Sequence, residues 1–116
     1  MSANDRDCLF CKIVAGEVES TNLYEDERVL AFKDVHAQAP FHALIVPKKH
    51  FATLDHFAPA DAELIGHLLL TAKEIAAQAG LPGYRVAMNV QGAGGQVIFH
   101  VHLHVLGGRP LSAALG

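Results

Sequence analysis

Hydrophobic and polar positions alternate one by one near the end of the chain, where three histidines are interleaved with apolar residues. Side chains along an extended strand point alternately to opposite faces, so this pattern predicts a β-strand over 98–106 with one buried face. The apolar face consists of Val101, Leu103 and Val105, and the polar face consists of His100, His102 and His104. Three imidazoles on one face indicate chemistry, since imidazole carries protons near neutral pH, attacks electrophiles and binds metals.

Four further segments carry strand signals and are separated by turn residues. They span 21–24, 29–33, 41–46 and 84–90. Residues 25–28 are charged and predict a tight turn that joins the first two segments in a hairpin. Pro47 ends the third segment, because proline has no N–H to donate to a neighbouring strand.

Apolar residues spaced three and four apart predict two helices, a short one over 8–15 and a long one over 59–79. Pro59 suits the first turn of the long helix, and Gly80 suits the position just after its end. The buried stripe of the long helix is predicted to consist of Leu64, Leu68, Ala72, Ile75 and Ala79. Hairpin-like connections imply antiparallel pairing, so we predict an α+β fold with about five strands, helices on one face of the sheet and the histidines on the other.

Length and composition restrict the classes of protein to which the chain can belong. A chain of 116 residues predicts a single domain over 1–116, and 51% hydrophobic against 18% charged residues favours an oligomer. The net charge of −3 and the lack of a basic tract beyond Lys48-Lys49 argue against a nucleic-acid polymer as partner. The chain has no apolar run long enough for a membrane span and no apolar leader at its start, so we expect a cytoplasmic protein.

The histidine strand has two chemical interpretations besides three solvated side chains. A metal site requires the side chains to converge on one ion and to recruit further ligands. A nucleophile requires a neutral imidazole whose one nitrogen donates to a fixed acceptor while the other faces the substrate. His102 is best placed for the second role, because a histidine on each side of it can bind the same substrate.

A glycine-rich loop at 91–96 leads directly into the histidine strand. Such a loop alone is usually a connector, but glycines also let backbone N–H groups approach an anion closely. Its position beside the histidines gives a phosphate cradle equal weight with a connector. Asn89, at the end of the preceding predicted strand, would point toward the same loop and histidines.

The two cysteines, Cys8 and Cys11, have the spacing of a weak zinc motif. His50 and His100 would complete a set of two cysteines and two histidines, although the spacing differs from that of a zinc finger. The alternative is a pair of buried or half-buried thiols in the first helix. His42 lies in an apolar strand, where a lone histidine is most often a hydrogen-bonded core residue.

Together these motifs resemble the histidine triad (HIT) family. Gly94-Gly95-Gln96 followed by His100-Val101-His102-Leu103-His104-Val105-Leu106 is similar to the family signature. Gly107-Gly108-Arg109-Pro110 is similar to the Hint-type branch, the purine nucleoside phosphoramidases. Blocks similar to those of the family occur in the family's order at 9–14, 24–26, 30–34, 38–40 and 46–50, so the resemblance covers nearly the whole chain.

The resemblance implies a hydrolase that cleaves the P–N bond of AMP or GMP phosphoramidates through a covalent nucleotidyl-histidine intermediate. In that scheme His102 is the nucleophile, the backbone carbonyl of His100 fixes the tautomer of His102, and His104 holds the phosphate or the leaving group. The implied nucleotide and phosphate contacts are Asn89, Gly95, Gln96, Val97, Asp34, Leu9, Phe10, Phe32, Val35 and His42. Asp34 would take the ribose hydroxyls. The wall of the purine pocket would consist of Leu9, Phe10, Phe32 and Val35.

The resemblance also implies a five-stranded antiparallel sheet and a homodimer in which two such sheets form one continuous sheet. In members with a Cys-x-x-Cys motif near the start it further implies a structural zinc ion. The zinc ligands would be Cys8, Cys11, His50 and His100. Catalysis needs no metal in this scheme, since a neutral imidazole is itself a good nucleophile.

Two features depart from the Hint pattern. Val97 stands where the branch usually has a serine that contacts the phosphate side, so we expect slower or differently selective hydrolysis. The C-terminal segment 110–116 lacks the Trp-Pro-Pro-Gly tail of eukaryotic members and is similar to that of bacterial ones. Two other functions therefore stay open: a dinucleoside polyphosphate hydrolase or nucleotidyl transferase, and a non-catalytic nucleotide-binding module.

Overall fold

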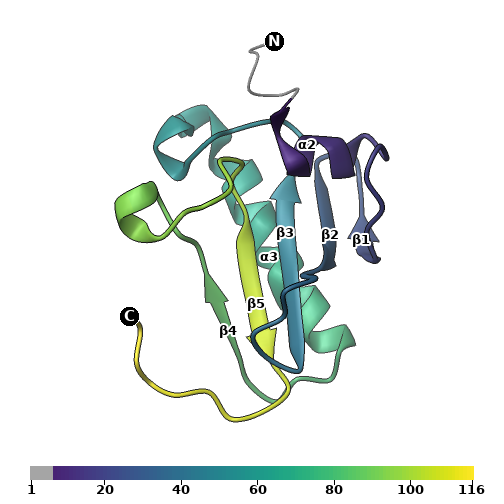
Figure 1. Cartoon of the computed structure of the whole chain (residues 1–116), viewed down its shortest axis with the longest axis vertical. Coiled ribbons are helices and arrows are strands. Elements are labelled where there is room, and N and C mark those ends of the chain that lie inside the picture. Colours follow the sequence, from purple (N-terminus) through teal and green to yellow (C-terminus); the bar gives the residue numbers. More distant parts are fainter. Residues whose placement is uncertain (1–6) are drawn as a thin grey trace.

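Five strands form one antiparallel sheet in the order β1-β2-β3-β5-β4 in the computed structural model, which describes residues 7–116 (Figure 1). The strands are β1 (Asn22–Glu25), β2 (Val29–Lys33), β3 (Phe41–Pro47), β4 (Tyr84–Ala87) and β5 (Leu103–Gly107). The helices are α2 (Leu9–Val14) and α3 (Ala62–Gln78), and short 3₁₀ turns lie at Leu54–His56, Pro59–Asp61 and Gly92–Gly94. The predicted α+β class, with a five-stranded antiparallel sheet and one long helix, is confirmed.

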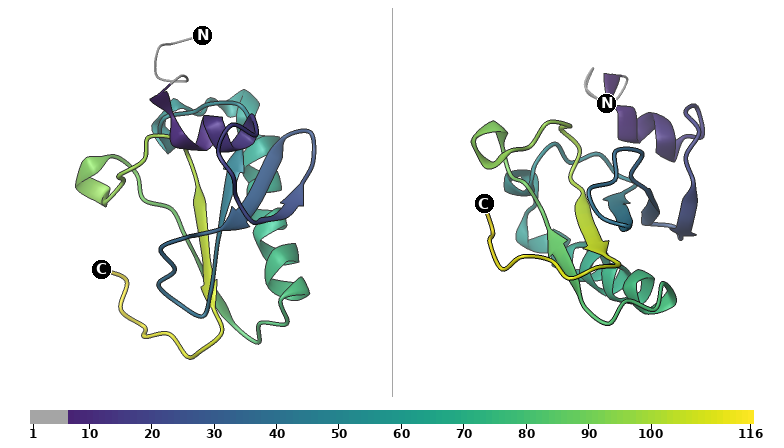
Figure 2. Two further views of the ribbon diagram at one scale, coloured as in Figure 1. Left: turned by 45° about the vertical axis from the view of Figure 1, so that its right-hand side comes forward. Right: turned by 60° about the horizontal axis from the view of Figure 1, so that its bottom comes forward.

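The two helices pack on opposite faces of the sheet (Figure 2). The prediction that the helices share one face and the histidines lie on the other is therefore wrong, because α2 packs on the face that carries His102 and His104. On one face, α3 residues such as Leu68 and Ile75 pack against Ile45 and its neighbours. On the other face, Phe10 of α2 packs against a cluster that includes Leu44. The middle strands are buried on both sides, which explains why β2 and β3 are almost continuous hydrophobic runs. Because α2 is short, it leaves part of its face of the sheet open to a cavity.

The long helix α3 begins later than the sequence pattern predicts, because Pro59–Asp61 forms a 3₁₀ turn ahead of it. Four residues of the predicted buried stripe lie in the core or at its margin: Leu64, Leu68, Ala72 and Ile75. The prediction for Ala79 is wrong: it caps the C-terminal end of the helix and is exposed, and Ala76 is buried in the core instead. Within residues 7–116 no helix combines the length and hydrophobicity needed to cross a membrane.

The histidine strand is shorter than predicted. β5 starts at Leu103, so only His104 lies within it, and the ladder with β3 and β4 does not include residues 98–102. The Val101 N–H donates to the Phe51 carbonyl at 2.7 Å. The prediction of three histidines on one strand face is therefore wrong, because side chains outside a regular strand need not alternate. The strand predicted over 84–90 likewise ends at Ala87.

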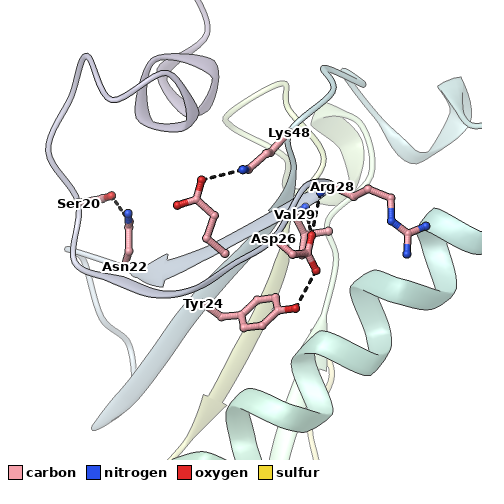
Figure 3. Close-up of polar contacts among 8 residues, drawn as sticks. Ser20, Asn22, Tyr24, Asp26, Arg28, Val29 and Lys48 are labelled. Atoms are coloured by element: carbon pink, nitrogen blue, oxygen red, sulfur yellow. Dashed lines mark hydrogen bonds and ion pairs between the residues drawn. The ribbon is translucent and has the colours of Figure 1, made fainter.

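The turn between β1 and β2 is held by the carboxylate of Asp26 (Figure 3). Its Oδ1 accepts hydrogen bonds from the backbone N–H groups of Arg28 and Val29, at 2.8 and 2.9 Å, and its Oδ2 accepts one from the Tyr24 hydroxyl at 2.7 Å. Nε2 of His67, on α3, lies 2.6 Å from the same Oδ2, so the turn is tied to the long helix. Burial by itself would raise the pKa of the Asp26 carboxyl, but these hydrogen bonds together hold that pKa well below its usual range.

Asp26→Asn is expected to lower the free energy of unfolding at neutral pH by about 1–3 kcal/mol, because an amide cannot replace the charge-assisted hydrogen bonds. A carboxyl whose folded-state pKa is depressed stabilises the fold above its unfolded pKa and loses that contribution as the pH falls. The advantage of the wild type should therefore shrink from about pH 4 downward. Urea unfolding of both proteins across pH measures this difference.

Glu25→Gln is the matched control for this prediction, since it breaks the exposed ion pair with Lys48 (2.6 Å) in the same hairpin. Its expected effect is below about 1 kcal/mol. A difference between Asp26→Asn and wild type that does not change with pH would show that the charge of Asp26 is not responsible.

Candidate active site and metal centre

A cavity of about 630 Å³ lies on the face of the sheet that carries α2. It is bounded by α2, the loop after β2, the end of β4 and the start of β5. Most of the predicted site residues line it: Leu9, Phe10, Phe32, Asp34, Val35, His42, Asn89, Gly95, Val97, His102 and His104. Of the predicted nucleotide and catalytic residues, Gln96 and His100 are not among its lining residues.

His102 is oriented by the chain two residues before it. Its Nδ1 lies 2.7 Å from the backbone carbonyl oxygen of His100. A carbonyl oxygen can only accept, so the ring proton is on Nδ1 and the lone pair of the neutral ring is on Nε2. The sequence-based expectation for the His100 carbonyl thus matches the geometry, although the His100 ring lies elsewhere.

The surroundings of His102 keep its ring neutral. The residue is 8% exposed, and its ring and that of Phe10 pack edge to face with the centroids 5.1 Å apart. Burial lowers the pKa of His102, and the hydrogen bond to His100 and the charge of Asp34 offset this only in part. A neutral imidazole with a fixed tautomer is the form that can attack an electrophile at neutral pH.

His42 and His104 form a hydrogen-bonded pair beside His102. The Gln38 N–H donates to His42 Nδ1 at 3.0 Å, so His42 carries its proton on Nε2. That Nε2 lies 2.9 Å from His104 Nδ1 and 3.3 Å from Asp34 Oδ2, which share its proton. His104 therefore accepts on Nδ1 and, when neutral, keeps its own proton on Nε2. One backbone donor thus sets the direction of the whole chain of hydrogen bonds.

The surroundings of His42 and His104 lower the pKa of both rings and so favour their neutral forms at neutral pH. Burial, together with the neighbouring His102 and His42, lowers the pKa of His104 to about 4, against the opposing charge of Asp34. Burial also lowers the pKa of His42, again against the charge of Asp34. The His104 ring stands 5.0 Å from that of His102 and 5.1 Å from that of His42, so a positive charge there would face two further imidazoles.

The donor atoms of Asp34, His42 and His104 also lie within 4.8 Å of one another, as metal ligands would. A histidine that binds a metal through Nε2 carries its proton on Nδ1 and needs an acceptor there. His42 Nδ1 instead faces the N–H of Gln38. The tautomer of His42 therefore fits a hydrogen-bonded role and not a metal ligand.

The glycine-rich loop closes one end of the cavity around Asn89. The Asn89 Nδ2 donates to the Gly94 carbonyl at 2.8 Å. Gly95 has a φ of 90°, and a Cβ on it would lie 2.9 Å from Asn89 Nδ2, so only glycine fits this position. Val97, 86% exposed, follows at the rim of the cavity.

Gln96 is placed inside the loop rather than toward the cavity. Its Oε1 accepts from the Gln91 N–H at 2.8 Å, and its Nε2 donates to the carbonyls of Ala52 and Ile98 at 2.7 and 3.1 Å. The residue is 5% exposed. Its side chain shapes the loop that carries Gly95, in place of the direct phosphate contact that the sequence suggested.

The apolar wall of the cavity has a buried layer and an exposed layer. Phe10 and Phe32 are buried and meet edge to face, with their ring centroids 5.5 Å apart. Leu9 is 43% exposed and Val35 is 87% exposed at the rim. The exposed pair can cover a flat apolar ligand, while the buried pair supports it from behind.

Sequence reasoning missed several lining residues, among them Arg85 and Gln38. Arg85 had a usable signal, because strand alternation places it on the same face as Ala87 and Asn89. Its guanidinium donates to the Ser112 carbonyl. Gln38 gave no signal, since its contribution is a backbone N–H that meets His42 only in the folded chain.

The second cluster lies behind the cavity and contains the predicted zinc ligands Cys8, Cys11, His50 and His100. Cys8 Sγ lies 3.2 Å from His100 Nδ1, and Cys11 Sγ lies 3.2 Å from His50 Nδ1. The two Nδ1 atoms are 3.2 Å apart. Zinc bound tetrahedrally by two nitrogens and two sulfurs separates neighbouring donors by about 3.3–3.8 Å, so the cluster is slightly smaller than a loaded site.

The tautomer of His100 agrees with a metal ligand. Its Nε2 donates to the Pro47 carbonyl at 2.7 Å, which leaves Nδ1 unprotonated and directed at the cluster. The residue is 0% exposed. Two imidazole nitrogens that face each other among two thiols form a donor set that fits zinc.

Comparisons with known proteins agree with this geometry. The family model described as the HIT domain matches residues 15–111. An uncharacterised HIT-like protein from Synechocystis is 49% identical over 107 residues, which are 91% of this chain and 94% of that protein. A HIT family hydrolase from Legionella pneumophila has a TM-score of 0.91 and 48% identity, over 94% of this chain and 99% of that chain. A zinc-bound histidine triad family protein from Mycobacterium smegmatis has a TM-score of 0.81 and 31% identity, over 90% of this chain and 77% of that chain.

Proposed function

This chain belongs to the HIT family, and from that premise we propose that it hydrolyses purine nucleoside 5′-monophosphoramidates, the reaction of the Hint-type branch. The observation that carries the proposal is the fixed tautomer of His102, whose Nδ1 is 2.7 Å from the His100 carbonyl. It leaves the Nε2 lone pair of a neutral ring at the cavity, where a phosphorus atom can be attacked.

In the proposed reaction His102 Nε2 attacks the phosphorus, a bond from phosphorus to the imidazole forms, and the P–N bond to the amine breaks. The departing amine takes the electron pair of that bond and a proton from solvent, while the Nε2–H of His104 is placed to donate a hydrogen bond to the leaving nitrogen. Water then attacks the phosphorus and returns a proton to solvent, the bond to His102 breaks, and the nucleoside monophosphate leaves with the neutral ring restored. The hydrogen bond from His42 to His104 (2.9 Å) keeps the His104 donor aimed outward throughout.

The rest of the cavity suits a nucleotide. Leu9 and Val35 offer apolar surface for a purine, and Asp34 offers a carboxylate for the ribose hydroxyls. Asp34 is itself positioned, because its Oδ1 accepts from the His36 N–H at 2.9 Å. Asn89 and Gly95 line the other end of the cavity, and we assign the phosphate to that end.

The glycines that follow the histidines have packing reasons of their own. A Cβ on Gly108, whose φ is 93°, would lie 2.9 Å from Pro40 Cβ, and one on Gly107 would lie 2.9 Å from Leu81 Cδ1. Arg109 then donates to the Gln38 carbonyl at 3.3 Å and braces the loop after β2. Gly107, Gly108 and Arg109 thus shape the site and do not themselves identify a substrate. An assay must therefore decide between the Hint-type reaction and the alternatives.

The assay compares a fluorogenic adenosine phosphoramidate with diadenosine polyphosphates. Turnover of the phosphoramidate alone supports the proposed function. Turnover of the polyphosphates would favour the dinucleoside polyphosphate hydrolase or transferase, and binding of AMP without turnover of either would favour a nucleotide-binding module.

Val97→Ser is expected to raise kcat for the phosphoramidate several-fold, by about 1–2 kcal/mol of transition-state stabilisation at most, because a hydroxyl can donate to the phosphate side and an isopropyl group cannot. Val97→Ala is the matched control, since it removes the same bulk without adding a donor. Equal kcat values for the two variants would show that the hydroxyl contributes nothing. Because Val97 is 86% exposed, neither change should affect folding.

A structural zinc ion held by Cys8, Cys11, His50 and His100 is part of the proposal. It is supported by the donor distances and by the tautomer of His100. Zinc at this site would tie α2 to the segment before β5 and would supply no group to the reaction itself.

A homodimer that continues the sheet across two chains also belongs to the proposal. β4 is an edge strand, and Val86 on it is 37% exposed. Leu69 and Leu70 on α3 are 51% and 61% exposed. Light scattering should give the mass of two chains, and Leu70→Glu should shift it to one, whereas Asn22→Glu at the opposite edge should not. A mass of one chain for the wild type would contradict the dimer.

A further inference from the structure

We propose that His100 is a positioning residue that couples the metal centre, formed by Cys8, Cys11, His50 and His100, to the proposed nucleophile His102. Its ring stands among the sulfur and nitrogen atoms of the metal centre, and its backbone carbonyl accepts the Nδ1–H of His102 at 2.7 Å. One residue therefore belongs to both sites. The inference rests on the proposed function for its kinetic readout, but its spectroscopic readout stands without it.

The carbonyl of His100 is not held by the sheet. β5 starts at Leu103, and the ladder with its neighbouring strands does not include residue 100. Two sets of contacts hold it instead. The ring is held by Nε2, which donates to the Pro47 carbonyl at 2.7 Å, and by Nδ1, which lies 3.2 and 3.4 Å from the sulfurs of Cys8 and Cys11. The Val101 N–H, in the same planar peptide group as the His100 carbonyl, donates to the Phe51 carbonyl at 2.7 Å. The position of the ring in the metal centre therefore sets the position of the carbonyl together with this one backbone hydrogen bond.

A displaced carbonyl would change the chemistry of His102. Without that acceptor the ring can place its proton on Nε2, where an N–H would replace the lone pair that attacks phosphorus. At 8% exposure, His102 has little access to water that could substitute for the carbonyl. Loss of the metal should therefore reduce the fraction of chains whose nucleophile has the productive tautomer.

Packing strengthens the same coupling. The ring of Phe10 contacts both histidines, with its centroid 6.0 Å from that of His100 and 5.1 Å from that of His102. Phe10 lies on α2, whose first turn is capped by Cys8 Sγ through a 3.2 Å contact with the Cys11 N–H. A metal ion on the two sulfurs would thus also fix the helix that presses Phe10 against the nucleophile.

The test compares His50→Cys with His50→Ala. His50 is not among the residues that line the cavity, and both changes remove the same imidazole. Three cysteines and one histidine are an accepted zinc set, so His50→Cys can keep the metal, whereas His50→Ala loses one of four ligands. Zinc per chain is measured for both variants and for the wild type.

We expect the wild type and His50→Cys to hold zinc and to have the same kcat. His50→Ala should lose the zinc, and its kcat should be lower by about 10-fold or more. The effect on KM should be smaller than the effect on kcat. Long-range ¹H–¹⁵N spectra should show the His102 proton on Nδ1 in the first two proteins and a mixture of tautomers in His50→Ala. If His50→Ala fails to fold, the wild type replaces it in the test. Chelation of the wild type should then lower kcat and mix the His102 tautomers, and added zinc should restore both.

Two results would overturn the inference. One is a metal-free protein, made by mutation or chelation, that keeps the kcat and the His102 tautomer of the wild type. The other is a zinc-loaded His50→Cys that behaves like His50→Ala. A wild type that hydrolyses no phosphoramidate would contradict the proposed function instead, and the ¹⁵N spectra would still decide the coupling.

Discussion

His102→Ala is expected to lower kcat for the adenosine phosphoramidate by about 10³-fold or more, because no other group can form the covalent intermediate. Binding of AMP should change little, since the apolar wall, Asp34 and the loop around Gly95 remain. Calorimetry with AMP and steady-state kinetics with the phosphoramidate separate these two quantities. Acid quenching of the wild type during turnover should also trap a chain that carries one nucleotidyl group, and the variant should show none.

His56→Ala is the control for this experiment. His56 is an exposed histidine in the turn Leu54–His56 and does not line the cavity, so its removal should leave kcat within about two-fold of the wild type. A His102→Ala variant that retains more than a tenth of the wild-type kcat would rule out His102 as the nucleophile.

Cys8→Ser is expected to reduce zinc from about one ion per chain to almost none and to lower the stability sharply. A bound metal present at a thousand times its Kd stabilises a fold by about 4 kcal/mol, which for a chain of this size corresponds to more than ~10 °C in Tm. Elemental analysis and thermal unfolding of the wild type, before and after chelation, measure both effects.

Cys8→Ala separates the metal from the helix cap. Cys8 Sγ also accepts from the Cys11 N–H at the start of α2, and a serine oxygen can keep that cap while an alanine cannot. Alanine should therefore cost about 1 kcal/mol more than serine, with the same loss of zinc. Equal and negligible zinc in the wild type and in both variants would remove the metal from the proposal.

Sequence patterns predicted the elements of the fold well where periodicity is local. The strands over 29–33 and 41–46 and the long helix appear within a few residues of their predicted bounds. The errors lie where a tertiary contact overrides the pattern. The Val101 N–H donates to the Phe51 carbonyl and not to a neighbouring strand, and residues 98–102 lie outside β5. The alternation of histidines nevertheless continues through them.

The candidate site was predictable to the extent that its contacts are short-range. The carbonyl that orients His102 belongs to a residue two positions earlier, so the sequence alone could name it. The pairing of His42 with His104 joins residues 62 positions apart and follows from the neighbouring strands β3 and β5. Because no sequence pattern identifies a partner for His42, a buried core histidine could not be distinguished from a site residue at this position.

The sequence by itself determined the family and the strand and helix periods and pointed to His102 as the candidate nucleophile, because each depends on residues close together in the chain. Only the tertiary structure decided which groups His100, His102 and His104 contact. The His100 ring meets Cys8 across 92 positions, and the proton of His42 is placed by a backbone N–H that no pattern of side chains reveals. The physical reason is that a tautomer depends on which donor or acceptor lies within hydrogen-bond distance, and folding alone sets that distance.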